Sequence, residues 1–330
     1  MTIHASRVLF RGENDCVIEE FETPSSLERG QMRVRNEASL VSAGTELAVL
    51  RKRHRAFALG NGSQNVWPHY PFYPGYAAVG LVEEVGPEVV DFAVGDRVWH
   101  PSSHSTMSIV GEASSVRVPA SIEPRDAVFF GLVEIAMTAI RRAPVELGQR
   151  VLVSGLGLVG ILVGELYQIS GASVTAADLS RGRLNRGAAL GFDPVIDLCG
   201  TSLVEWYEAH PDSLPDLSIE AAGIESNIDA CLKVTKPGGR VVLQGSPRKT
   251  MEIDPYTDIH RKGLTIIGAH VNTVSADVRK RDAPYLFTLC EGPLHIADIR
   301  THEMSFRDAP TLYDRLEDSL DEYLAVVLTY

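Results

Sequence analysis

The sequence predicts an α/β protein in which a β-rich N-terminal part is followed by a doubly wound parallel sheet with helices on both faces. Up to about residue 125, short alternating apolar runs are separated by frequent Gly and Pro residues, which is typical of a mostly antiparallel barrel or sandwich. From Arg150 onward, apolar strand-like segments alternate with helical stretches, as in consecutive βαβ units.

The individual elements follow from these patterns. In the N-terminal part we expect β structure within residues 6–10, 32–44, 76–100 and 114–120. In the second part we expect strands within 151–155, 173–179, 218–223, 240–245 and 264–269, and helices within 158–171 and 180–191. The remaining tail is loop-rich and ends in an amphipathic helix around 309–324. Three regions are therefore predicted, at 1–125, 126–268 and 269–330.

Length and charge exclude several classes of protein. The 330 residues suffice for two domains with hydrophobic cores, because 45% of them are apolar. With 31 Lys and Arg against 43 Asp and Glu, the net charge of −12 repels nucleic acid and anionic lipid, so neither is an expected partner. The longest uncharged apolar run, 151–164, is short for a membrane span.

The N-terminal segment and the cysteines favour a cytoplasmic protein. The first 15 residues lack the apolar core of a secretory signal. Cys16, Cys199, Cys231 and Cys290 include no CxxC pair, so the sequence predicts neither a disulfide framework nor a local zinc site.

A glycine fingerprint marks the start of the second part. Gly155, Gly157 and Gly160 form GxGxxG directly after an apolar strand and at the start of an apolar helix that begins with Leu158 and Val159. In a Rossmann fold, the first glycine makes the tight turn, the second lets the backbone approach a pyrophosphate, and the third lets helix and strand pack closely. The pyrophosphate then lies at the helix N-terminus. These residues are therefore predicted to bind a nicotinamide dinucleotide.

The choice between NAD and NADP depends on the end of the next strand. Asp178 lies 18 residues after Gly160, where a carboxylate accepts hydrogen bonds from ribose hydroxyls and repels a 2′-phosphate. Arg181 and Arg183 favour the opposite choice, and Arg183 is a further candidate for cofactor contact. The sequence thus favours NAD and leaves NADP open.

Seven motifs together resemble one family. They are SAGTE at 42–46, PGYAAVG at 74–80, VGDRV at 94–98, GLGLVG at 155–160, IEAAG at 219–223, KPGGRV at 236–241 and IGA at 267–269. With them the chain resembles, over nearly its whole length, the zinc alcohol and polyol dehydrogenases of the medium-chain dehydrogenase/reductase superfamily. The resemblance implies a GroES-like catalytic domain, a Rossmann domain, a return segment, and a homodimer or homotetramer. It also implies that the cofactor is lined by Thr138, Ala222, Gly245 and Gly268.

The usual zinc ligands are missing. This chain has Ala43 where relatives carry a zinc-binding cysteine and Tyr76 where they carry a zinc-binding histidine. Glu134 alone matches a position at which polyol dehydrogenases place a carboxylate ligand. Because catalytic zinc requires about three protein ligands, we expect an enzyme without a metal site. The cysteine-rich lobe that holds structural zinc in many relatives is also missing.

Without zinc, a side chain must exchange the proton. Tyr76 replaces a metal ligand and is the first candidate, as its phenol can donate to a carbonyl, although a packed aromatic is an equal alternative. Glu134 is the second, since burial raises the pKa of a carboxyl group; it could instead be an ion pair left from a metal-binding ancestor. Thr45 and Glu46 match positions of the proton relay and of the zinc's surroundings in relatives.

Two histidines are further candidates for acid–base chemistry. His104 follows the VGDRVWHP strand, and His270 follows a strand end that passes the nicotinamide in relatives. Each could act as a base or as a hydrogen-bond donor to the substrate, or be purely structural.

An unusual segment separates Ala43 from Tyr76. It begins with five basic or potentially basic residues at 51–55 and ends rich in aromatic residues and proline at 67–73. One hypothesis is a site for a large or anionic alcohol. The alternative is a solvated charge run followed by an apolar loop at a subunit contact.

The sequence therefore predicts a zinc-independent NAD(P)-dependent dehydrogenase that acts on a small-molecule secondary alcohol or ketone. The SxGTE and PGYxxVG combination is similar to a zinc-free branch that includes a bacteriochlorophyllide hydroxyethyl-group dehydrogenase. Similar sequences are common in secondary metabolism, and this similarity does not select a substrate. Two alternatives stay open. One is an NADPH-dependent reductase of conjugated C=C or C=N bonds, and the other is a dinucleotide-binding protein without catalysis.

Overall fold

The computed structural model describes residues 3–58, 67–319 and 321–330. The chain forms two compact units, of which the first comprises residues 1–131 and 275–330 and the second residues 132–274. These divisions fall shortly after the predicted boundaries at 125/126 and 268/269.

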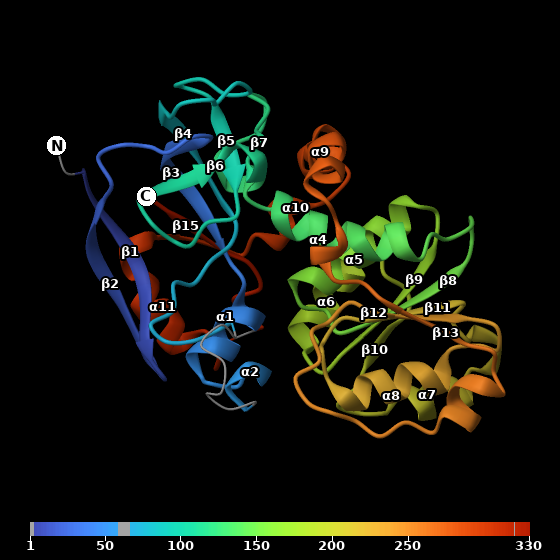
Figure 1. The fold of residues 1–330 in the computed structure, drawn as a ribbon. Helices are drawn as coiled ribbons and strands as arrows, with labels where there is room; N and C mark the ends of the chain where they lie inside the picture. Colours follow the sequence, from blue (N-terminus) through green and yellow to red (C-terminus); the bar gives the residue numbers. More distant parts are fainter. Residues whose placement is uncertain (1–2, 59–66, 320) are drawn as a thin grey trace. The chain divides into compact units, whose positions relative to one another are not determined.

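The first unit is built on β structure (Figure 1). A seven-stranded sheet has the order β14-β15-β3-β4-β5-β7, with β6 also paired to β3, and all its pairs except β14 with β15 are antiparallel. A separate antiparallel ribbon consists of β1 (Ile3–Gly12) and β2 (Asp15–Thr23). The sheet strands are β3 (Gln31–Val41), β4 (Ala78–Val85), β5 (Arg97–His100), β6 (Met107–Gly111), β7 (Val116–Arg117), β14 (His302–Ser305) and β15 (Val326–Thr329).

The first unit also contains helices of 4 to 16 residues. They are α1 (Ala43–Leu50), α2 (Arg55–Ala58), α3 (Pro124–Ala127), α9 (Ala276–Glu291), α10 (Ile296–Ile299) and α11 (Ala309–Arg315), while α4 (Phe130–Arg142) begins here and continues into the second unit. The helix expected over 309–324 is shorter than predicted, because turns follow Arg315. Asp and Ser residues in the sequence after it favour turns over helix interior.

The two sequence segments of the first unit share one core. Strand β15 pairs with β3, placing Val326 opposite Val41. Both side chains are buried in a cluster that also contains Leu50 of α1 and Leu312 of α11. The return segment is therefore part of the same hydrophobic core as the N-terminal strands.

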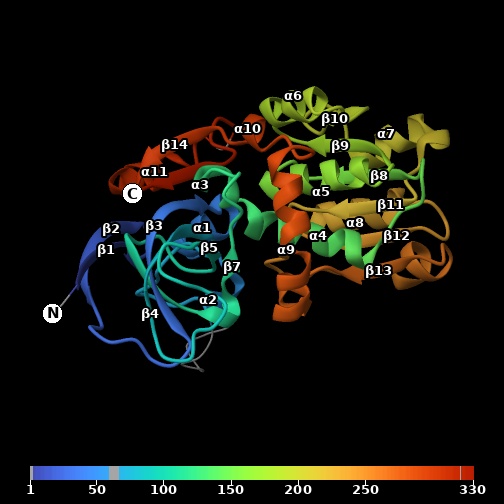
Figure 2. The ribbon, with the colours of Figure 1, turned by 90° about the horizontal axis from the view of Figure 1, so that it is seen from above.

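The second unit contains the expected parallel sheet. Its order is β10-β9-β8-β11-β12-β13, and every pair is parallel. The helices cover both faces, with α5 on one face and α8 on the other (Figures 1 and 2). The strands are β8 (Arg150–Ser154), β9 (Ser173–Asp178), β10 (Val195–Asp197), β11 (Leu217–Glu220), β12 (Arg240–Leu243) and β13 (Thr265–Gly268). The helices are α5 (Leu158–Ile169), α6 (Arg181–Ala189), α7 (Leu203–Ala209) and α8 (Glu225–Val234).

The strand order positions the dinucleotide loop. From β8 the chain proceeds to β9 on one side, while β11, β12 and β13 lie on the other side of β8. In open α/β sheets, ligands bind at the carboxyl ends of strands where the order reverses in this way. The fold prediction is confirmed in this respect. Among the helices within the described ranges, none combines the length and the apolar character needed to cross a membrane.

Candidate active site

The glycine loop has the geometry that its sequence predicts. Gly155 has a φ of +100°, a left-handed conformation that a side chain disfavours. A Cβ at Gly160 would lie 1.9 Å from the Gly155 carbonyl oxygen, so the close packing of helix on turn requires glycine there. Helix α5 begins with Leu158 and Val159 after Gly157, which supplies no side-chain cap. The N–H groups of this helix end therefore suit a diphosphate.

Asp178 ends β9 beside this loop. Its Oδ2 accepts a hydrogen bond from the backbone N–H of Leu156 at 2.6 Å, and its Oδ1 accepts one from the N–H of Ser180 at 2.8 Å. Arg183 Nη1 lies 3.8 Å from Oδ2. These contacts hold the carboxylate against the glycine loop, and a carboxylate has lone pairs for further donors such as ribose hydroxyls.

Three further predicted cofactor positions lie at the same sheet edge. A Cβ at Gly155 would lie 2.9 Å from the backbone nitrogen of Ala222, which places the turn after β11 against the glycine loop. A Cβ at Gly245 would lie 2.3 Å from the nitrogen of Gly223, which follows Ala222. Gly268 ends β13. The residues present thus fit a nicotinamide dinucleotide.

Tyr76 lies in the first unit. It follows Gly75, whose φ is +96° and whose Cβ, if present, would lie 2.7 Å from the backbone nitrogen of His104. The Tyr76 hydroxyl donates a hydrogen bond to Ser42 Oγ at 2.5 Å. Burial raises the pKa of Tyr76 to about 12, the nearby Glu46 charge adds to the rise, and hydrogen bonds with Ser42 and Thr45 oppose it. Tyr76 is therefore a phenol, not a phenolate, near neutral pH.

Glu46 lies on α1 with only 1% of its surface exposed. Its Oε1 accepts a hydrogen bond from the N–H of Ser42 at 3.1 Å, and its Oε2 accepts one from the Tyr313 hydroxyl at 2.5 Å. His104, which is also buried, brings its Nε2 to 3.4 Å from Glu46 Oε1. The structure therefore brings Glu46 and His104 together, and places Tyr76 beside the same carboxylate through Ser42.

His104 connects this group to the sheet. Its Nδ1 lies 2.7 Å from Ser39 Oγ, which in turn lies 2.7 Å from the hydroxyl of Tyr330. We call this group of side chains the polar cluster; it comprises Ser39, Ser42, Thr45, Glu46, Tyr76, His104, Tyr313 and Tyr330. Ser39, Ser42, Tyr313 and Tyr330 were not predicted. Of these four residues, only Ser42 belongs to a recognised motif, SAGTE at 42–46, that could have indicated it.

The other candidate residues belong to the second unit. Glu134 is buried on α4, and Thr138, also predicted to line the cofactor, donates its hydroxyl to the Glu134 carbonyl oxygen at 3.1 Å. His270 is exposed after β13, and its Nδ1 accepts a hydrogen bond from the N–H of Asn272 at 3.1 Å. This contact caps a short turn, which is a structural role.

A catalytic zinc does not fit the residues present. Ala43 offers no ligand atom at the position of the family's cysteine, and the phenol of Tyr76 is hydrogen-bonded to Ser42 at the position of the histidine. In the part of the chain that the structure describes, no group of three His, Cys, Asp or Glu side chains is arranged to hold a metal ion.

The basic segment is tied to the return segment. Arg51 and Arg53 both form ion pairs with Glu317, and Arg51 also donates to Asn14 Oδ1 at 2.8 Å. Two of the positive charges proposed to bind an anionic substrate thus share one carboxylate of the chain. Trp67 is 56% exposed and packs edge-on against His54, while residues 59–66 of this segment lie outside the described residues.

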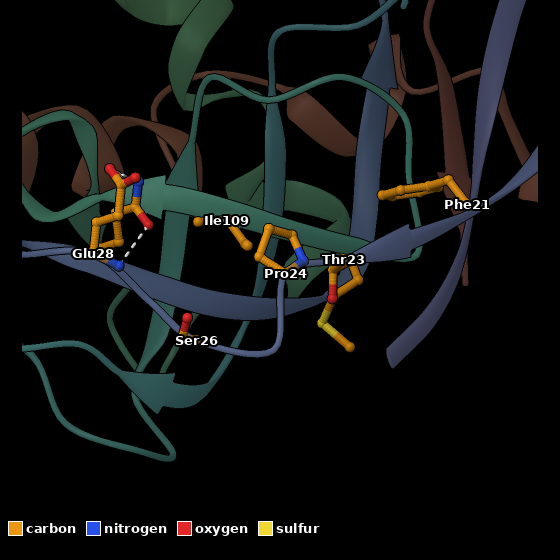
Figure 3. Close-up of a pocket in the computed structure, with 8 residues that line it drawn as sticks. Phe21, Thr23, Pro24, Ser26, Glu28 and Ile109 are labelled. Carbon is orange, nitrogen blue, oxygen red and sulfur yellow. Dashed lines mark hydrogen bonds between the residues drawn. The ribbon is translucent and has the colours of Figure 1, made fainter. Parts of the chain in front are cut away.

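A pocket of about 420 Å³ lies elsewhere in the first unit, between the end of β2, the loop after it and β6 (Figure 3). Phe21 and Ile109 form part of its wall, and Gln31 there donates to Glu28 Oε2 at 3.3 Å. None of the predicted site residues lines it.

Comparisons with known proteins agree with this description. Residues 29–160 match the model of the alcohol dehydrogenase GroES-like domain, and residues 159–285 match that of the zinc-binding dehydrogenase domain. An alcohol dehydrogenase of Geobacillus stearothermophilus is 24% identical over 293 residues, which cover 78% of this chain and 85% of that protein.

Solved structures share the fold over almost the whole chain. An alcohol dehydrogenase from Escherichia coli CFT073 in complex with NADH gives a TM-score of 0.85 at 21% identity and covers 99% of both chains. A protein from Sinorhizobium meliloti 1021, described as a zinc-binding dehydrogenase bound to NADP, gives 0.84 at 19% identity and covers 99% of this chain and 100% of its own. The chain belongs to the medium-chain dehydrogenase/reductase superfamily and is an alcohol dehydrogenase-like oxidoreductase that uses a nicotinamide dinucleotide.

Proposed function

We propose that this protein is a zinc-independent dehydrogenase that interconverts a secondary alcohol and a ketone, with the Tyr76 phenol exchanging the proton. The observation that carries the proposal is the position of Tyr76. It stands where relatives carry a zinc-binding histidine, and its hydroxyl lies 2.5 Å from Ser42 Oγ, beside the buried carboxylate of Glu46.

The protonation state of Tyr76 favours reduction of the ketone. With a pKa of about 12, the phenol is a hydrogen-bond donor at neutral pH, which suits a carbonyl oxygen that gains negative charge. The bound nicotinamide supplies the hydride for this direction. Tyr76 then gives its proton to the developing alkoxide, and the hydroxyl of Ser42 can rotate to donate to the phenolate that remains.

Glu46 supports this role through its charge. The carboxylate of Glu46 raises the pKa of Tyr76 and so keeps the phenol protonated until the alkoxide forms. The Tyr313 hydroxyl and the Ser42 N–H hold the carboxylate in place. Thr45, which hydrogen-bonds with Tyr76, lowers the energy of the phenolate.

We propose NAD rather than NADP as the cofactor. Asp178 is fixed against the glycine loop by the N–H groups of Leu156 and Ser180, where its charge would repel a 2′-phosphate. Arg183 lies 3.8 Å from the same carboxylate, so part of its charge is offset there.

A second candidate is reduction of a conjugated C=C or C=N bond. The protonated state of Tyr76 favours it as well, because such a reduction also ends with delivery of a proton to carbon, oxygen or nitrogen. Turnover of enones or imines with NADPH, together with no oxidation of any alcohol, would identify this activity.

The test combines metal analysis with Tyr76→Phe. After dialysis against a weak chelator, the protein should contain no stoichiometric zinc and should still reduce ketones with NADH. Tyr76→Phe should lower kcat by about 100-fold or more, with little change in the dissociation constant for NADH. Tyr70→Phe is the control, because its phenol donates to the Val49 carbonyl oxygen instead. One tightly held zinc per chain, or full activity of Tyr76→Phe, would refute the proposal.

A further inference from the structure

A buried carboxyl group with no assigned role lies at the end of β11, one of the two central strands of the second unit. Glu220 is the last residue of β11, and its side chain is fully buried. Its Oε1 accepts hydrogen bonds from three consecutive backbone N–H groups, those of Ala222 at 2.9 Å, Gly223 at 2.8 Å and Ile224 at 3.4 Å. One side-chain oxygen thus accepts hydrogen bonds from all three of these N–H groups in the turn that follows the strand.

The second oxygen of this carboxyl group is enclosed. Glu220 Oε2 has no hydrogen-bond partner among the residues that the structure describes. A Cβ at Gly245 would come within 2.9 Å of it, so glycine at 245 leaves just enough room for the carboxyl group. Burial raises the pKa of Glu220, and the three N–H groups oppose this rise. Burying such a group costs free energy, and the three hydrogen bonds to Oε1 offset this cost for only one of its two oxygens.

Without the Glu220 carboxyl group, the three N–H groups would attract an anion. They immediately precede α8, a ten-residue helix whose N-cap is Ile224. Consecutive N–H groups at a helix N-terminus form a positive concavity that binds phosphate or carboxylate. Helix α5 has a comparable N-terminus at Gly157, which no side chain caps. At this sheet edge the N-terminus of α5 therefore has no side-chain cap, whereas the N–H groups before α8 are occupied by the chain's own carboxyl group.

The turn held by Glu220 supports the glycine loop. A Cβ at Gly155 would lie 2.9 Å from the nitrogen of Ala222, and one at Gly160 would lie 3.4 Å from the Cβ of Ala221. These two glycines are the first and third of the fingerprint. A shift of the turn by even a few tenths of an ångström would therefore move the loop that receives the diphosphate.

We propose that Glu220 is a positioning residue of the dinucleotide site. Its carboxyl group fills the N–H concavity before α8, which holds residues 221–224 against the glycine loop and leaves the N-terminus of α5 as the place for the diphosphate. The inference rests on dinucleotide binding and is independent of the chemistry proposed for Tyr76, because it is tested without any substrate.

The test measures NADH binding by fluorescence titration of four variants of the full chain. Glu220→Ala removes the acceptor, and Glu220→Asp withdraws it by one methylene while keeping the charge. Both are expected to raise the dissociation constant for NADH at least tenfold. Glu220→Gln keeps an oxygen for the three N–H groups and should stay within threefold of the parent. Asp229→Asn removes a charge from the same helix, where it pairs with Lys233, and should bind like the parent.

A second measurement separates positioning from simple stability. Inorganic phosphate at millimolar concentration should raise the melting temperature of Glu220→Ala more than that of the parent, because the vacated N–H groups can then bind an anion. If Glu220→Ala does not fold, the dissociation constant of Glu220→Asp for NADH is compared with that of the parent instead. Parent-like NADH binding by either folded variant would overturn the proposal, as would equal losses in Glu220→Gln and Glu220→Ala.

Discussion

The hydrogen bond from Tyr313 to Glu46 can be tested by removing a single oxygen. Tyr313→Phe keeps the ring, which packs edge-on against Phe10 at 5.0 Å between centroids, and deletes only the hydroxyl. That hydroxyl donates to Glu46 Oε2 at 2.5 Å, and both side chains are buried. A hydrogen bond to a charged group contributes about 1.5–3 kcal/mol to the free energy of unfolding. The deletion should therefore cost about that much.

This loss can be measured as a change in melting temperature and in the urea midpoint. For a unit of roughly 150–250 residues, each kcal/mol shifts the melting temperature by about 2–4 °C, so a fall of roughly 3–12 °C is expected. Tyr256→Phe serves as the control, because Tyr256 is 64% exposed and its change should stay within about 0.5 kcal/mol.

A double-mutant cycle identifies the partner. In a Glu46→Gln background the same deletion removes a neutral hydrogen bond and should cost only about 0.5–1.5 kcal/mol. If Tyr313→Phe is as stable as the parent, or costs the same with Glu46 as with Gln at this position, then the carboxylate does not depend on Tyr313 and the description of the polar cluster is wrong.

Two further predictions concern buried positions. His100 is fully buried and its pKa is lowered by burial from 6.5 to about 3, so the unfolded chain binds the proton in this window and stability should fall as pH falls from 6.5 towards 3. His100→Gln should flatten the dependence of melting temperature on pH over that window, and an unchanged slope would contradict this assignment. Gly160→Ala should weaken NADH binding at least tenfold and lower the melting temperature, because its Cβ would meet the Gly155 carbonyl oxygen. Gly157→Ala, which has room in the unbound protein, should weaken binding without lowering the melting temperature; equal melting temperatures for the two variants would count against the packing argument.

The sequence predicted the second unit better than the polar cluster, and the reason is distance along the chain. Gly155, Gly157 and Gly160 lie within six consecutive residues, so their spacing alone predicts the geometry of the loop between β8 and α5. Glu46 and Tyr313 are 267 positions apart, and no local pattern indicates that they meet.

Single candidates in the first unit were identified more readily than their partners. Tyr76 and Glu46 were predicted from family positions and His104 from its place after the VGDRVWHP strand, yet their grouping around one carboxylate could not be predicted. Glu220 belongs to the motif IEAAG at 219–223, which was used only as evidence for the family resemblance. Its role depends on three backbone N–H groups, which side-chain patterns do not reveal.

The division of the chain also has a consequence for its synthesis. Residues 132–274 form a compact unit by themselves, whereas the first unit needs residues 275–330 to complete its sheet and its core. On the ribosome, the dinucleotide-binding unit can therefore fold while the sheet of the first unit still lacks β14 and β15. Glu46 has no phenol donor until Tyr313 has been made. The order of translation thus delays the assembly of the polar cluster until residues 132–274 have been synthesised.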